Sequence, residues 1–167
     1  MVGVFVVIAP AVVDLAPGVG VGRHRTRGRP PRSRVSAFCT ELTGITQAEA
    51  DRGVSLARAC DTLVREHGAG ARPWASWGDY DRKQFVRQCA ADGVPYPFGL
   101  PAERSHTNAK AVFTEAHGLR RRPGMARALE IAGLPLEGRH HRGVDDAWNI
   151  AALVLRLAGR DAWPGSC

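Results

Sequence analysis

The sequence predicts a layered α/β domain, and three observations carry this prediction. A β-branched apolar run near the start of the 167-residue chain favours a buried strand. A short apolar segment at 73–77 favours another strand in the middle of the chain. Amphipathic segments with capping residues then predict a series of helices. Strands that come first, followed by helices that alternate with a strand, are typical of an α/β layer.

Two strands and a turn are expected near the start. Residues 5–15 are predicted to form a strand that bends or breaks at Pro10, because proline cannot donate a ladder hydrogen bond. Ala-Pro-Gly at 16–18 is typical of a turn, and residues 20–27 are expected to return as a second strand. The Pro- and Arg-rich residues 29–32 indicate a loop.

The helices are predicted from apolar spacing and from capping residues. Thr46 and Glu49 have the spacing of a capping box, and Gly44, Gly68 and Gly118 are expected to end helices. The helical segments expected are 36–42, a stretch that opens at Thr46, 54–67, 80–92, 108–117, 123–132 and 143–157. The side chains expected to face the core are Leu56, Cys60, Leu63, Val64, Phe85, Val86, Cys89, Ala90, Val144, Trp148, Ala151, Ala152 and Leu155.

The charge balance favours an anionic partner without proving one. The net charge is +7, the sequence pI is about 10.0, and Lys83 and Lys110 are the only lysines. A basic surface suits a phosphate backbone, although a composition bias toward arginine would give the same balance. The arginines between 23 and 34 are expected to form a solvated loop rather than a phosphate contact.

The cysteines and the apolar start bear on location. Cys39, Cys60, Cys89 and Cys167 form no C-x-x-C pair, so free thiols in a reducing cytoplasm are expected rather than disulfides or a structural zinc. The apolar run 1–13 is too short to span a bilayer, and no basic residue precedes it. The sequence therefore predicts a cytoplasmic protein with no membrane partner and no signal peptide.

One string near the C-terminus has the chemistry of a hydrolytic site. His141 stands at the start of the helix expected at 143–157, and Asp146 follows five residues later. An imidazole suits proton transfer near neutral pH, and a carboxylate suits a hard divalent cation. This spacing is common by chance, so the string gains meaning only beside others.

Two further strings have structural explanations of their own. Asp79 and Asp81 open the helix expected at 80–92, where the helix dipole favours acidic residues even without chemistry. They also follow a strand, at the sheet edge where α/β folds build their sites. In the third string, at 36–47, the apolar side chains could simply belong to the core.

Taken in order, the three strings resemble the DEDDh 3′–5′ exonucleases, the superfamily of RNase T and DNA polymerase III epsilon. The matching strings are FCTELTGITQ (38–47), WGDYDRKQF (77–85) and EGRHHRGVDDAWNIA (137–151). The branch most similar is that of the histone-mRNA 3′ exonucleases. The resemblance implies a ribonuclease-H-like three-layer α/β fold, with a mixed sheet flanked by helices. It spans residues 4–158, so we expect an exonuclease domain at 1–160 and a tail at 161–167.

The resemblance also implies a site. Asp81 and Asp146 match metal-binding aspartates, and His141 matches the general base. Leu42 and Thr43 match positions that hold the 3′-terminal nucleotide. The implied cofactor is a pair of Mg²⁺ or Mn²⁺ ions, and the implied partner is the 3′ end of a single-stranded RNA or DNA. His140 and Asp145 are expected to be neighbours without a direct role.

The chain departs from the family at one motif. The family begins with an Asp-x-Glu pair on its first, central strand, and no such pair stands in residues 1–35. We therefore expect a fold that lacks this strand and a two-metal site that lacks two carboxylates. Whether the chain is an active enzyme stays open at this point. The alternatives are a protein that binds nucleic acid without turnover and a gene fragment without function.

Overall fold

The structure is a computed structural model that describes residues 7–8, 10–15, 19–29, 34–99, 101 and 105–159. The described residues divide into two compact units. The first unit draws on Met1–Ile8, Arg25–Ala75 and Asp79–Thr107, and the second on Ala9–His24, Ser76–Gly78 and Asn108–Cys167. The tail expected at 161–167 lies outside the described residues.

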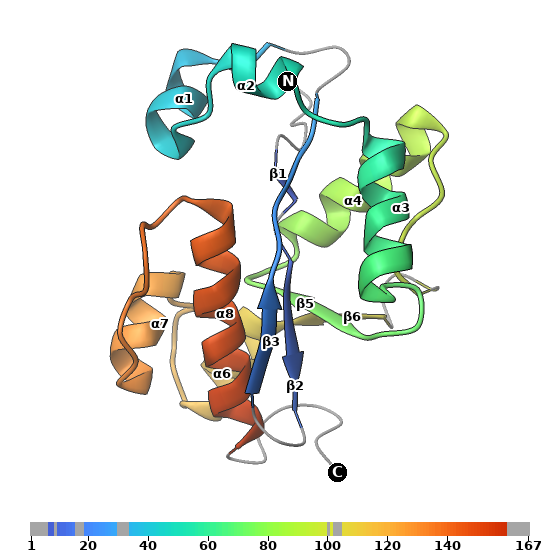
Figure 1. The fold of residues 1–167 in the computed structure, drawn as a ribbon. Coiled ribbons are helices and arrows are strands. Elements are labelled where there is room, and N and C mark those ends of the chain that lie inside the picture. Colours follow the sequence, from blue (N-terminus) through green and yellow to red (C-terminus); the bar gives the residue numbers. More distant parts are fainter. Residues whose placement is uncertain are drawn as a thin grey trace. The chain divides into compact units, whose positions relative to one another are not determined.

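The first unit surrounds a core made by one short strand and two helices. Strand β1 (Val7–Ile8) pairs antiparallel with β4 (Thr26–Arg27). Ile8 from β1 packs with side chains of α3 (Leu56–His67) and α4 (Tyr80–Asp92), which are labelled in Figure 1. The buried members of this core are Ile8, Ala59, Cys60, Leu63, Ala69, Phe85 and Cys89.

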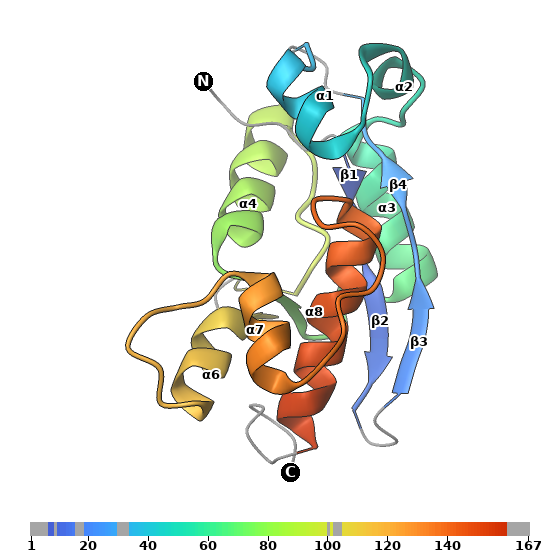
Figure 2. The same cartoon turned by 90° about the vertical axis from the view of Figure 1, so that its left-hand side faces the viewer.

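The second unit is built on helix α8 (Gly143–Ala158). Strands β2 (Ala11–Asp14) and β3 (Val19–Arg23) form an antiparallel hairpin whose register shifts between Val12 and Val13. Helix α8 packs against this hairpin and against α6 (Ala109–Ala116) and α7 (Met125–Ala132), as Figures 1 and 2 show. The largest fully buried side chains are Phe113, Leu129, Leu153, Leu157 and Asn149.

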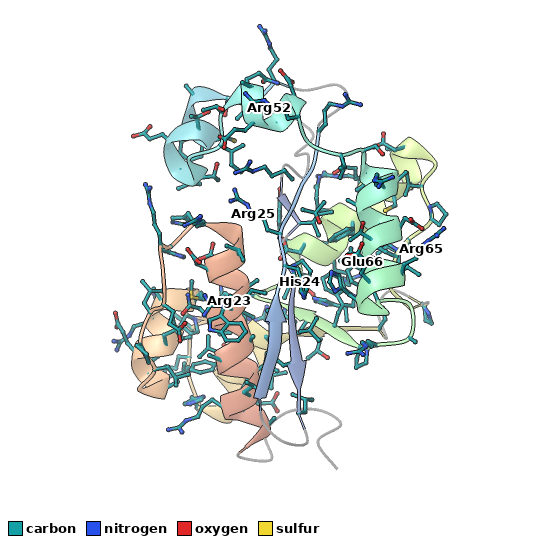
Figure 3. The ribbon with its side chains drawn as sticks, viewed as in Figure 1. Arg23, His24, Arg25, Arg52, Arg65 and Glu66 are labelled. Atoms are coloured by element: carbon teal, nitrogen blue, oxygen red, sulfur yellow. The ribbon has the colours of Figure 1, made fainter. Side chains whose placement is uncertain are left out.

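Arg23 ties the hairpin to α8. Its guanidinium lies 4.1 Å from the centroid of the Trp148 ring, and its Nη2 donates a hydrogen bond of 2.6 Å to Glu137 Oε2. Figure 3 shows Arg23 reaching from β3 toward α8. Gly20 allows this close packing, because an added Cβ would lie 2.3 Å from the Trp148 ring. The strand is thus fixed on the helix that carries the Asp145–Asp146 pair.

The described strands pair only two by two. Besides β1–β4 and β2–β3, strand β5 (Trp74–Ser76) pairs with β6 (His106–Asn108). Over the described ranges no ladder joins one pair to another, and Gly28–Val54 adds a single parallel bridge. This is the pattern expected of a sequence that lacks the central strand of the family.

Several predicted elements are confirmed. The first strand run breaks around Pro10, and the return run is split into β3 and β4. Helix α1 (Ala37–Thr43) begins at Ser36 and ends at Gly44 in a left-handed conformation. Helix α2 (Gln47–Asp51) has the full capping box between Thr46 and Glu49. Helix α4 has the predicted bounds.

Three predicted helix starts were wrong by one or two residues. Helix α3 begins at Leu56 because Ser55 caps it and Val54 is held by the bridge to Gly28. Helix α7 begins at Met125 because Gly124 takes the capping position. Helix α6 begins at Ala109 because Asn108 caps it at the end of β6, a strand that the sequence analysis missed, and its C-cap is His117, not Gly118.

The predicted buried faces also need correction. Val64, Val86 and Ala90 are exposed, whereas Gln84 and Gln88 of α4 are buried. In α8 the predicted stripe is wrong apart from Ala151, since Val144, Trp148, Ala152 and Leu155 are only half-buried. The buried row is Asp145, Asn149, Leu153 and Leu157. Two polar members of that row have a structural task in the site.

The remaining expectations concern thiols and membranes. Cys39, Cys60 and Cys89 are free, and Cys167 lies outside the described residues. Across the part of the chain that the structure describes, no helix combines the length and the apolar character needed to span a bilayer.

Candidate functional site

A turn fixed by two buried polar side chains leads into α8. Asn149 is 1% exposed; its Oδ1 accepts from Glu137 N at 2.9 Å and its Nδ2 donates to Glu137 O at 2.8 Å. Asp145 is also buried, and its Oδ2 accepts from Arg139 N at 3.1 Å. Gly138 has a φ of 73°, and an added Cβ would lie 2.4 Å from Asp145 Cγ. These contacts leave the turn one conformation.

This turn places two histidines against one carboxylate. His140 Nδ1 lies 2.9 Å from Asp146 Oδ1, and the His141 backbone N–H donates to the same oxygen at 3.2 Å. The two imidazole rings are stacked, with centroids 3.9 Å apart. Asp146 is half-buried in the first turn of α8, where the helix dipole favours its negative charge.

His141 has an unusual backbone conformation. Its φ of 67° makes it the only non-glycine residue with a positive φ within the described ranges. Such a conformation costs on the order of 1–3 kcal/mol and persists only where the surroundings impose it. The hydrogen bond from its N–H to Asp146 contributes to that constraint. The result is an exposed imidazole held close to a carboxylate.

Asp81 lies in the first turn of α4 in the first unit. Its carboxylate is half-buried, and burial raises its pKa above the usual range. Among the described residues it has no hydrogen-bond or ion-pair partner. Asp79 caps the same helix, and its Oδ1 lies 3.9 Å from both Arg82 Nε and His106 Nδ1. Of the two acidic residues, Asp81 is therefore the one whose charge nothing in the described protein offsets.

Leu42 and Thr43 end helix α1, also in the first unit. Leu42 is exposed, and so is Phe38 one turn earlier at 68%; α1 buries none of its residues. The Thr43 hydroxyl donates to Cys39 O at 2.6 Å and accepts from Ile45 N at 3.3 Å. The helix end thus offers an apolar surface beside a fixed hydroxyl.

The structure brings together some of the predicted site residues. His141 and Asp146 lie together in the second unit, and His140 joins them. Asp81, Leu42 and Thr43 belong to the first unit. That all of them line one site stays a prediction.

The sequence analysis missed the residues that shape the turn. Asp145 and Asn149 stand four apart on α8, a spacing that places two side chains on one face. Their polarity suggested the solvent side, so only the unmade backbone bonds at 137–139 could have signalled burial. Gly138 stands where a turn is expected and gave the remaining signal.

Comparison with known sequences identifies the family. The sequence model described as Exonuclease, of the RNase T family, matches residues 12–154. The chain is 29% identical over 144 residues to the 3′–5′ exonuclease Snipper of Drosophila melanogaster, covering 74% of this chain and 50% of that protein. It is 31% identical over 147 residues to ERI1 exoribonuclease 2 of Danio rerio, covering 75% and 26%. The chain thus spans half or less of the length of these relatives.

Solved structures agree on the fold. The nuclease domain of 3′hExo, described as a DEDDh family member bound to rAMP, matches with a TM-score of 0.82 at 22% identity, over 94% of this chain and 82% of that one. A full-length 3′-exonuclease matches with a TM-score of 0.81 at 20% identity, over 94% and 72%. The ribonuclease-H-like α/β fold is confirmed, and the chain belongs to the RNase T family of exonucleases, in agreement with its DEDDh motifs.

Proposed function

We propose that this chain is a metal-dependent 3′–5′ exonuclease that hydrolyses phosphodiester bonds at the 3′ end of single-stranded RNA or DNA. The observation that carries the proposal is the constrained His141–Asp146 arrangement inside the residues that match the exonuclease family. A buried-turn scaffold that imposes a costly backbone conformation on a histidine is typical of a functional site. A cytoplasmic location remains a prediction from the free thiols.

The carboxylates suit a hard divalent ion. Asp81 is half-buried with no partner among the described residues, and such a charge is stabilised by a cation. Asp146 directs one oxygen to His140 and to the backbone of His141. We assign Asp81 and Asp146 to hold Mg²⁺ or Mn²⁺. When bound, these ions neutralise phosphate charge and make water a stronger nucleophile.

The remaining groups bind substrate and move the proton. His141 presents an exposed imidazole, which accepts the proton of the attacking water at a ring nitrogen. Water forms the new P–O bond, the bond to the sugar 3′ oxygen breaks, and a nucleoside monophosphate leaves. Leu42 and Phe38 give the terminal base an apolar surface, and Thr43 lies beside it.

A second candidate function is nucleic-acid binding without turnover. The observation that favours it is the missing Asp-x-Glu pair, which removes two of the four family carboxylates from the sequence. Losing a single stabilising group in an active site costs on the order of 10²–10³ in rate. The net charge of +7 would still attract a phosphate backbone.

Mononucleotide release distinguishes the two candidates. The purified chain would be incubated with 3′-labelled single-stranded RNA and DNA and Mg²⁺ or Mn²⁺. Variants Asp146→Asn and His141→Ala, purified identically, control for contaminating nuclease. A further version would carry an added N-terminal strand with an Asp-x-Glu pair.

We expect slow release by the chain, loss of release in both variants, and a gain of at least about 10²-fold in the extended version. Binding without release in every version would favour the second candidate. Equal release by the chain and by Asp146→Asn would contradict the site.

A further inference from the structure

The start of α8 gathers a set of donors that differs from a carboxylate site. His140, His141 and Asp146 each offer one ligand atom, and these three atoms lie within 4.8 Å of one another. His140 supplies the closest pair, with Nδ1 at 2.9 Å from Asp146 Oδ1. The family resemblance assigns no role to His140, so this side chain is unexplained by the proposed nuclease site.

We propose that His140, His141 and Asp146 form a binding site for a divalent transition metal ion, with Zn²⁺ as the best match. Two imidazole nitrogens and one carboxylate oxygen suit Zn²⁺, Co²⁺ or Ni²⁺, whereas Mg²⁺ prefers oxygen ligands and retains its waters. Three protein ligands and one open position are a common arrangement around zinc.

The site needs only a small closure of its ligands. Ligand atoms about 2.0–2.2 Å from a tetrahedral zinc lie roughly 3.4 Å from one another. The present spread of up to 4.8 Å therefore has to shrink by side-chain rotation. The His140 side chain is 39% exposed and His141 is exposed, so both rings can turn without displacing the core.

The backbone beneath the ligands is already fixed. Asp145 and Asn149 hold residues 137–139, and Gly138 fits only as glycine. Supporting groups of this kind orient metal ligands and raise affinity. A transition metal bound here would engage both His141 and Asp146, the two residues that the proposed nuclease function requires. Metal binding would thus oppose turnover, with His140 as the residue that sets the competition.

Binding of Zn²⁺ and Co²⁺ tests the site without any nuclease assay, so this inference and the proposed function can fail separately. The whole chain would be titrated with Zn²⁺ by calorimetry in excess Mg²⁺, and with Co²⁺ by visible absorption, which reports nitrogen ligation directly. The variants are His140→Ala and His140→Gln; His24→Ala removes an exposed imidazole from the same unit as a matched control.

We expect one Zn²⁺ per chain, a loss of affinity of at least about tenfold in both His140 variants, and unchanged binding in His24→Ala. The Co²⁺ spectrum of the unsubstituted chain should show imidazole ligation, a readout that depends on no variant. Displacement of Zn²⁺ by Mg²⁺, or equal affinity with and without the His140 ring, would overturn the proposal.

Discussion

At the residue scale, Gly138 is the point where the turn before α8 tolerates least change. Its φ is 73°, and the nearest atom to an added Cβ is Asp145 Cγ at 2.4 Å. We expect Gly138→Ala to lower the free energy of unfolding by about 2–4 kcal/mol, from the left-handed backbone and from the collision together.

Gly133 provides the matched control for that change. Its φ of 67° is similar, but an added Cβ meets nothing within 4 Å. Gly133→Ala should therefore cost only the backbone part, about 1–2 kcal/mol. Denaturant unfolding measures both variants. If they lose equal stability, the Asp145 contact does not constrain the turn.

Asp81 should reduce stability in the absence of metal. Burial raises the pKa of its carboxyl above the usual 3.8, so between these values the folded chain holds more protons than the unfolded chain. Stability therefore falls as pH rises through the raised pKa. We expect Asp81→Asn to raise the melting temperature at pH 7 in EDTA, and the gain to vanish below pH 3.8.

Asp79 gives the opposite expectation on the same helix. Its carboxylate lies 3.9 Å from Arg82 Nε and from His106 Nδ1, so Asp79→Asn removes favourable contacts. This variant should gain no stability at pH 7. A gain as large as that of Asp81→Asn would show that helix-start charge in general, rather than burial of Asp81, sets the effect.

At the element scale, strand β6 carries a buried histidine that should make stability depend on pH. The His106 side chain is 2% exposed and lies 4.5 Å, centroid to centroid, from Trp74. Loss of hydration lowers its pKa below the usual 6.5, although Asp79 opposes this shift. The unfolded chain therefore binds a proton first, and stability is lost as pH falls from 6.5 through the lowered pKa.

The substitution His106→Gln removes that titration. Thermal melts at pH 7.5 and pH 5 should show a smaller loss on acidification for this variant than for the unsubstituted chain. His24→Gln, at an exposed position, should behave like the unsubstituted chain. An unchanged acid loss in His106→Gln would place the pH dependence elsewhere.

The elements themselves were largely predictable, and their buried faces were not. Capping residues such as Ser36, Thr46 and Gly68 are local signals, so they locate helix ends without tertiary information. The face of α8 depends on which backbone groups need partners elsewhere. Asp145 and Asn149 look like solvent-side residues until the turn at 137–139 is seen. Strand β6 is three residues long, too short for a periodic pattern.

At the scale of the whole molecule, the order of three strings predicted the family and the fold class. Each string alone had a structural explanation, but their joint order along 38–151 did not. The division into two units could not be predicted, because each unit combines segments that are distant in sequence. The His140 contact with Asp146 also depends on the left-handed backbone at His141, which no local pattern signals.

The central claim is that Asp81 from one unit and Asp146 from the other hold metal at one site beside His141. A crystal structure of the chain grown with Mn²⁺ and a nucleoside monophosphate tests this directly through the anomalous signal of manganese. We predict manganese with both carboxylates at oxygen-ligand distances, roughly 2.0–2.6 Å, and the His141 ring at the rim. Manganese bound by only one of the two aspartates, or carboxylates that face opposite sides of the molecule, would contradict the account.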